Sequence, residues 1–167
     1  MSEGLVRTGY LSDQELERGP GVPSAARRGR GPVAVIECVQ PIPCNPCESS
    51  CRVGAIHVGE DINNPPRLDE DKCVGCQSCL PICPGQAIFL VDESPADDRA
   101  AVTVPYEFLP LPEKGATVTA LDRSGRPLGD ASITAVRLTE KMDRTALVTM
   151  ELPRSWAMRA RAFRLKG

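Results

Sequence analysis

The chain has 167 residues, 41% of them hydrophobic but only 4% aromatic, and its formal net charge is −2. A small core with few large rings usually needs metals, disulfides or a partner for stability. The balance of 20 basic and 22 acidic residues gives no electrostatic reason to expect binding to nucleic acid or to an anionic membrane. The sequence contains neither a signal-peptide core nor an apolar run of the roughly 18 residues that a membrane span requires. We therefore expect no membrane span and a cytoplasmic location.

Residues 1–32 are predicted to form an extended leader or docking arm. Ser12 and Glu15 match a capping box at the start of a short helix, which a following Gly-Pro pair would end. The Gly-, Pro- and Arg-rich remainder, residues 19–32, predicts an extended or disordered strap. This composition fits an arm that embraces a partner and a flexible tail equally well.

All eight cysteines lie between Cys38 and Cys83, and without an export signal such clustering favours metal binding over disulfides. The region 33–92 contains an internal repeat, because three cysteines and a following Ala-Ile pair recur 32 residues later. The repeated cysteines are Cys44, Cys47 and Cys51 in the first copy and Cys76, Cys79 and Cys83 in the second. A duplicated half predicts a domain with pseudo-twofold symmetry.

The second copy, "CVGCQSCLPICP", has the spacing C-x2-C-x2-C-x3-C-P and runs from Cys73 to Pro84. Bacterial ferredoxins use this run to bind [4Fe–4S] clusters, and in two-cluster proteins its fourth cysteine ligates the other cluster. Gly75 is expected near the cluster, where a small residue leaves room for the sulfides, and Pro84 turns the chain out of the loop. Zinc is the weaker interpretation, since structural zinc sites typically use two separated C-x2-C pairs.

The first copy, "ECVQPIPCNPCESSCRVGAI", departs from this pattern. Pro41 occupies the position of the first ligand, and Cys38 lies three residues earlier. Either the longer loop still returns Cys38 to the cluster, or Cys38 is a free thiol and the first cluster is [3Fe–4S] or has another fourth ligand. Eight cysteines match the needs of two cubanes, which favours Cys38 as a ligand. Arg52 occupies the position at which the motif has Pro. Two interpretations are open: Arg52 is a cation that raises the potential of a nearby cluster, or it is a solvated surface residue.

Crossed ligation between the two copies predicts two ligand sets. The ligands expected for cluster 1 are Cys38, Cys44, Cys47 and Cys83, and those expected for cluster 2 are Cys73, Cys76, Cys79 and Cys51. Because every iron would then carry a protein thiolate, we expect no open position for a substrate and no catalytic site in this chain. His57, the only histidine, is expected at the surface rather than as a ligand.

Residues 93–167 differ in character from the cysteine-rich region. Four runs of strand-type residues, 101–108, 116–122, 131–138 and 145–152, alternate with predicted turns. They predict a small antiparallel β-sheet or partly closed barrel, followed by a short basic C-terminal helix. With a two-cluster ferredoxin-like domain at 33–92, the fold class expected for the chain is α+β.

Residues 31–140 resemble the small iron–sulfur subunits of multi-subunit, FAD-containing amino-acid dehydrogenases of the proline, hydroxyproline and sarcosine oxidase-like type. The resemblance is carried by the cysteine motifs, above all "IPCNPCE", and by "PYEFLPLPEKG". It implies two [4Fe–4S] clusters and a hetero-oligomer with FAD-containing dehydrogenase subunits. The implied role is to pass single electrons between flavin sites or to an external acceptor. Two alternatives are a free-standing two-cluster ferredoxin and, in another class, a structural zinc-binding interaction module.

Overall fold

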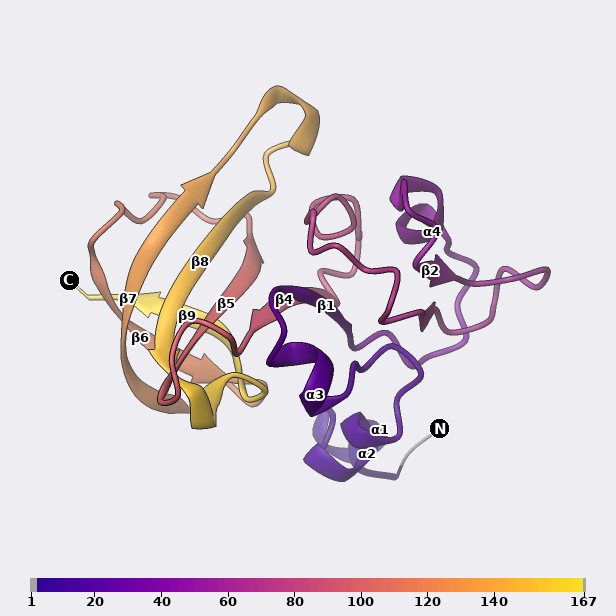
Figure 1. Ribbon diagram of the computed structural model, residues 1–167, viewed down its shortest axis with the longest axis horizontal. Helices are drawn as coiled ribbons and strands as arrows, with labels where there is room; N and C mark the ends of the chain where they lie inside the picture. The colour runs from indigo at the N-terminus through magenta and orange to yellow at the C-terminus, as the bar shows by residue number, and fades with distance from the viewer. Residues whose placement is uncertain (1–2, 167) are drawn as a thin grey trace.

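The computed structural model describes residues 3–166 and is built around a seven-stranded antiparallel sheet (Figure 1). The strand order is β1-β4-β5-β8-β7-β6-β9. The seven strands are β1 (Val33–Ile36), β4 (Ile88–Asp92), β5 (Arg99–Tyr106), β6 (Thr117–Asp122), β7 (Pro127–Arg137), β8 (Ala146–Pro153) and β9 (Ala160–Leu165). A second, two-stranded sheet pairs β2 (Ile56–His57) with β3 (Arg67–Leu68).

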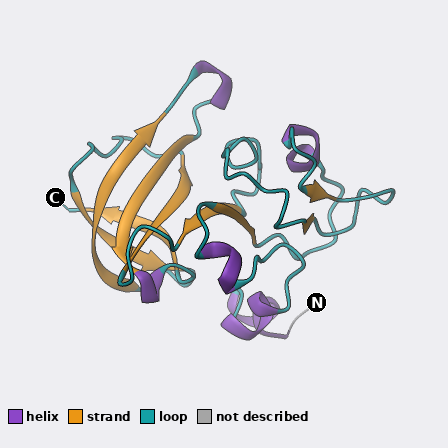
Figure 2. Ribbon diagram, in the orientation of Figure 1, coloured by secondary structure: helices purple, strands orange, loops and turns teal. Residues whose placement is uncertain are grey.

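All helices of the described chain are short and lie outside the seven-stranded sheet, as Figure 2 shows. They are α1 (Glu3–Thr8), α2 (Asp13–Glu17), α3 (Ala25–Arg28), α4 (Pro46–Ser50) and the 3-10 turns η1 (Glu140–Met142) and η2 (Arg154–Trp156). Strands β5, β6, β7 and β8 overlap the four predicted runs of the C-terminal region, although β7 begins at Pro127, four residues before its run. The expected α+β class, with an antiparallel β module, is confirmed.

The C-terminal helix predicted from the basic sequence is wrong, because residues 160–165 form strand β9. The stretch alternates basic and apolar side chains, and strand β6 offers an open edge with which β9 pairs from Val118 to Asp122. Backbone hydrogen bonds to that edge outweigh the weak helical preference of a short segment. Only the turn η2 before β9 has helical geometry.

Two hydrophobic cores lie on the two sides of the β1–β4 pair. The larger core fills the curled sheet with alternate residues of β5 and β8, such as Val102, Val104, Val148 and Met150. The second core lies against the cysteine-rich loops and includes Cys47 and Cys79 as buried members. The cysteine-rich region and the β module therefore share one continuous sheet.

The internal repeat of the sequence has a structural counterpart in crossed strand pairs. Strand β1 of the first copy pairs with β4 of the second, while β2 of the first pairs with β3 of the second. The hydrogen bond from Glu37 N to Ala87 O, 2.8 Å, is matched by the bond from Asp69 N to Ala55 O, 2.7 Å. Each pair maps onto the other by the shift of 32 residues, which is the pseudo-twofold arrangement that the repeat predicts.

The described part of the N-terminal segment packs against the rest of the chain. The capping box of α2 forms as predicted, with Ser12 and Glu15 bonded reciprocally. Residues 19–32, predicted as an extended or disordered strap, contain α3, and Gly21 O accepts a hydrogen bond from Ile36 N at 2.9 Å. No helix in residues 3–166 is long and apolar enough to cross a membrane.

Candidate metal centre

The structure brings Cys38, Cys44, Cys47 and Cys83 together as one group. Cys38 follows β1, Cys44 precedes α4, Cys47 lies within α4 and Cys83 lies in the loop before β4. Burial raises the pKa of the Cys47 thiol to about 11, and the charges of the other three cysteines contribute to the rise. The pKa of Cys38 is raised by burial and by the charges of Cys83 and Cys44. The loop with the extra residues thus returns Cys38 to this group, although its ligand role stays a prediction.

The other four cysteines form a second group, in which Cys51 of the first copy joins three cysteines of the second. Burial raises the pKa of Cys79 to about 12, with contributions from the charges of Cys73, Cys76 and Cys51. Cys76 is exposed, and its pKa is lowered, mainly by a hydrogen bond with the Ser78 hydroxyl. The two groups have the same membership as the crossed ligand sets predicted from the repeat.

Main-chain amides donate to two of the sulfurs in the same way in each half. Ala55 N donates to Cys51 Sγ at 3.2 Å, and Ala87 N donates to Cys83 Sγ at 3.4 Å. These donors are the alanines of the repeated Ala-Ile pair, so the repeat itself marks them. Ala34 N also donates to Cys73 Sγ, at 3.5 Å, and nothing in the local sequence indicates it. Amide hydrogen bonds to cluster sulfurs stabilise the reduced cluster and raise its potential.

Gly75 is required by the loop of the second group for two reasons. Its φ is +67°, and a Cβ at this position would lie 2.7 Å from Pro32 O. The loop can therefore approach the segment before β1 only with glycine here. The exposed Pro84 directly follows Cys83, at the start of the turn that leads into β4.

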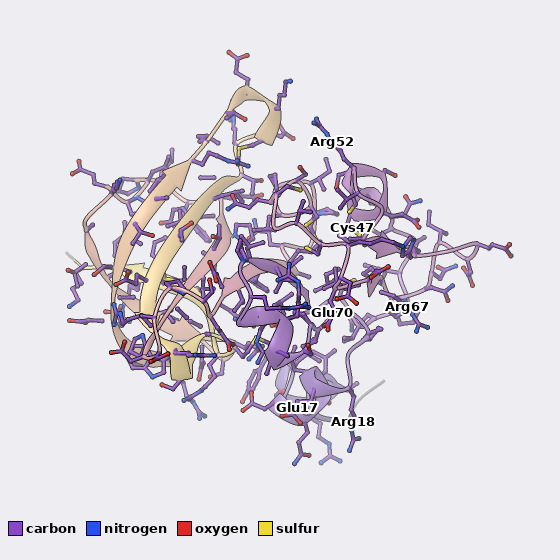
Figure 3. The ribbon with its side chains drawn as sticks, viewed as in Figure 1. Glu17, Arg18, Cys47, Arg52, Arg67 and Glu70 are labelled. Atoms are coloured by element: carbon purple, nitrogen blue, oxygen red, sulfur yellow. The ribbon has the colours of Figure 1, made fainter. Side chains whose placement is uncertain are left out.

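The Arg52 side chain projects from the cysteine-rich half, as its label in Figure 3 shows. Its positive charge contributes to the lowered pKa of Cys76, so it lies within electrostatic range of the second group, to which its sequence neighbour Cys51 also belongs. His57 is exposed, and its Nδ1 lies 4.0 Å from a carboxylate oxygen of Glu48.

The residues around the two groups fit [4Fe–4S] clusters. An apolar pocket is lined by all four cysteines of the second group together with small or apolar side chains, including Ala34 and Val74. Both groups pack against the second hydrophobic core, which buries Cys47 and Cys79, while Cys76 is exposed. Within residues 3–166, no three His, Cys, Asp or Glu side chains are arranged to hold a single metal ion. A cubane takes one thiolate at each of four iron corners, so its ligands need not converge on one point.

The 4Fe-4S binding domain family matches residues 66–89. A ferredoxin of Saccharopolyspora erythraea is 33% identical over 86 residues, which are 49% of this chain and 77% of that protein. One subunit of the ion-translocating oxidoreductase complex of Methanosarcina acetivorans is 41% identical over 63 residues, 38% of this chain but only 22% of that protein. One subunit of the selenate reductase of Mesobacillus selenatarsenatis is 26% identical over 132 residues, 78% of this chain and 42% of that protein. No solved structure matches the chain significantly.

The crossed cysteine groups, the pseudo-twofold strand pairs and the matched domain define a 4Fe–4S protein of the ferredoxin type. The chain is 33% identical to the Saccharopolyspora erythraea ferredoxin over 77% of the length of that protein, and it therefore belongs to the ferredoxin family. Iron–sulfur electron transfer is the function of this family.

Proposed function

We propose that this chain is the electron-transfer subunit of an FAD-dependent amino-acid or amine dehydrogenase complex and carries two [4Fe–4S] clusters. Single electrons would pass through it between flavin sites or to an external acceptor. The observation that carries the proposal is the crossed grouping of the eight cysteines, four on each side of the pseudo-twofold axis. Each half contributes a ligand to the other's group, so the two clusters would be held in one rigid unit.

A bound [4Fe–4S] cluster supplies one-electron redox chemistry at a potential set by its surroundings. The residues of this chain determine those surroundings. The eight thiols would bind as thiolates, so loading the sites releases protons, most clearly from Cys47 and Cys79 with their raised pKa values. The amides of Ala55 and Ala87 orient the sulfurs of Cys51 and Cys83, and both cysteines pack against the apolar core. Arg52 places a positive charge near the second group.

The β module supports a subunit rather than a mobile carrier. The similarity to the selenate reductase subunit covers 78% of this chain and so extends well beyond the cysteine-rich region. Phe108 and Leu109, in the loop after β5, are 72% and 86% exposed. Two adjacent large apolar side chains at the surface are typical of a contact site. Partner subunits that contain FAD, and a cytoplasmic location, are part of this proposal.

The alternative, a free-standing two-cluster ferredoxin, is favoured by the similarity to the ferredoxin of Saccharopolyspora erythraea. Affinity purification of the tagged chain from its own cells, without oxygen, separates the two. We expect FAD-containing subunits in stoichiometric amounts and electron transfer from an amino acid or amine to a dye. A chain that purifies alone, with both clusters loaded, would identify a free carrier.

The clusters themselves are tested on the purified chain. We expect about eight iron atoms per chain, four for each cubane, and EPR signals of two [4Fe–4S] clusters after reduction. A colourless chain that holds zinc would contradict both electron-transfer proposals and favour the zinc-binding module.

A further inference from the structure

Arg27 is a buried arginine in the N-terminal segment, with a relative exposure of 9%. Its guanidinium donates only to main-chain carbonyl oxygens among its described hydrogen bonds. Nε bonds to Glu70 O at 2.9 Å and Nη1 to Gly31 O at 3.0 Å. Nη2 bonds to both Pro32 O at 3.2 Å and Cys73 O at 2.6 Å. One side chain therefore holds together two segments that are about forty residues apart in sequence.

These two segments form one side of the second cysteine group. The segment of Pro32 leads into β1, whose Ala34 amide donates to Cys73 Sγ at 3.5 Å. The other segment carries Cys73 itself and then Gly75, whose backbone lies against Pro32 so closely that no Cβ fits between them. Arg27 thus bridges the contact across which the Cys73 sulfur receives its hydrogen bond.

Helix α3, which carries Arg27, is itself fixed at both ends. Ser24 caps the helix by accepting from Arg27 N at 3.1 Å and donates from its hydroxyl to a Glu70 carboxylate oxygen at 2.8 Å. Figure 3 shows Glu70 beside α3. At the other end, Arg28 Nε donates to Glu93 at 2.6 Å, and both side chains are largely buried. The segment expected to be an extended strap is here part of the wall of the cysteine-rich half.

We propose that Arg27 is a positioning residue for the second cysteine group, and that its positive charge raises the potential of the cluster bound there. The proposal rests on the proposed function, since the group must hold a cluster. The planar guanidinium reaches four carbonyls at once, which the three donors of a lysine ammonium on a flexible stem cannot do. A fixed cation near a cluster stabilises its reduced, more negative state. The N-terminal segment is then a component of the metal centre.

The test compares the wild type with Arg27→Gln, Arg27→Lys and the control Arg30→Gln. Arg30 lies three residues away, is exposed and forms an ion pair with the exposed Asp71 at 3.3 Å, so its substitution removes the same charge without the bridge. Each chain is loaded with iron and sulfide without oxygen, and its iron loss to a chelator and the EPR-monitored potentials of both clusters are measured. A Cys76→Ser chain identifies which EPR signal belongs to the second group.

For Arg27→Gln we expect several-fold faster iron loss from the second group and a more negative potential for that cluster alone. Arg27→Lys should also lose iron faster but keep a potential closer to that of the wild type, and Arg30→Gln should match the wild type in both. If Arg27→Gln does not fold, Arg27→Lys decides the question through its iron loss. Rates and potentials equal to those of Arg30→Gln, or equal changes in both clusters, would overturn the role of Arg27. A wild-type chain that binds no clusters would overturn the proposed function instead, and this role with it.

Discussion

The substitution Glu37→Gln removes the buried carboxylate from an ion network that links the cysteine-rich region to the β module. Glu37 lies between β1 and Cys38. Arg161 Nε donates to it at 2.6 Å, and Arg123 donates through Nε and Nη2 at 2.8 and 2.7 Å. The three side chains are only 8%, 4% and 9% exposed. Arg161 also lies over the Phe89 ring, 4.9 Å from its centroid.

The expected loss of stability follows from the buried arginines that the substitution leaves without Glu37. Arg161 and Arg123, both buried, would lose this carboxylate, while Arg123 would keep its 3.8 Å contact with the exposed Asp13. Removal of one partner of a buried ion pair costs about 3–5 kcal/mol of unfolding free energy. For a chain of this size each 1 kcal/mol lowers the melting temperature by about 2–4 °C. We therefore expect Glu37→Gln to melt about 6–20 °C lower than the wild type. The burial that lowers the pKa of Arg161 to about 10 would no longer be offset by the nearby carboxylate.

The assay is thermal unfolding followed by circular dichroism, without oxygen and at one fixed heating rate. Glu151→Gln is the matched control, because its ion pair with Arg99 joins side chains that are 45% and 36% exposed. Such an exposed pair contributes less than about 1 kcal/mol, so this variant should melt near the wild type. If Glu37→Gln melted within the range of Glu151→Gln, the network would contribute no more than a surface pair, and the reasoning would be refuted.

Four further outcomes are expected. Cys38→Ser should convert one cubane to a three-iron or labile cluster, and an unchanged iron content and EPR spectrum would exclude Cys38 as a ligand. Gly75→Ala should destabilise the chain more than Gly125→Ala, measured by melting, because both have positive φ but only Gly75 meets backbone, at Pro32 O; equal losses would show that the contact is unimportant. Removal of iron by a chelator should speed amide hydrogen exchange around the cysteine-lined core while the core of the β module stays protected. An equal increase of the exchange rate in both cores would contradict the idea that they can unfold separately. Burial opposes ionisation of Glu37, but the hydrogen bonds and charges of Arg123 and Arg161 outweigh it and hold the pKa of Glu37 below its ordinary 4.5. The contribution of Glu37 to the free energy of unfolding is therefore complete above about pH 4.5 and is lost as the pH falls through the pKa of the folded state. The difference in melting temperature between wild type and Glu37→Gln should become smaller in this acidic range, where Glu37 is protonated. A difference that stays constant with pH would show that the ionisation of Glu37 does not contribute to stability.

Part of the candidate site could be predicted because its signals are local. Ligands two or three residues apart on one loop are specified by spacing alone, and the shift of 32 residues between the copies extends the pattern to the crossed groups. The strands of the β module were also predictable, since their alternation of apolar side chains has the period of an extended chain. The C-terminal segment was predicted wrongly as a helix, because the basic residues of "ARAFRL" obscure its alternation of apolar side chains.

Other features depend on contacts between residues far apart in the chain. Arg27 meets the Cys73 carbonyl across 46 positions, and Arg161 meets Glu37 across 124. The sequence shows these arginines only as members of basic stretches, which are usually solvated. Their burial follows from the path of the chain around them.

The sequence by itself determined the cysteine pattern, the duplication that crosses the two ligand sets, and the strand periodicity of the β module. The tertiary structure decided that β1 and β4 join the β module in one sheet, that β9 closes on β6, and that α3 belongs to the wall of the second cysteine group. The physical reason is the sequence separation over which each interaction acts. Ligand spacing and side-chain alternation act over a few residues, whereas buried arginines and shared sheet edges find their partners only when the whole chain has folded.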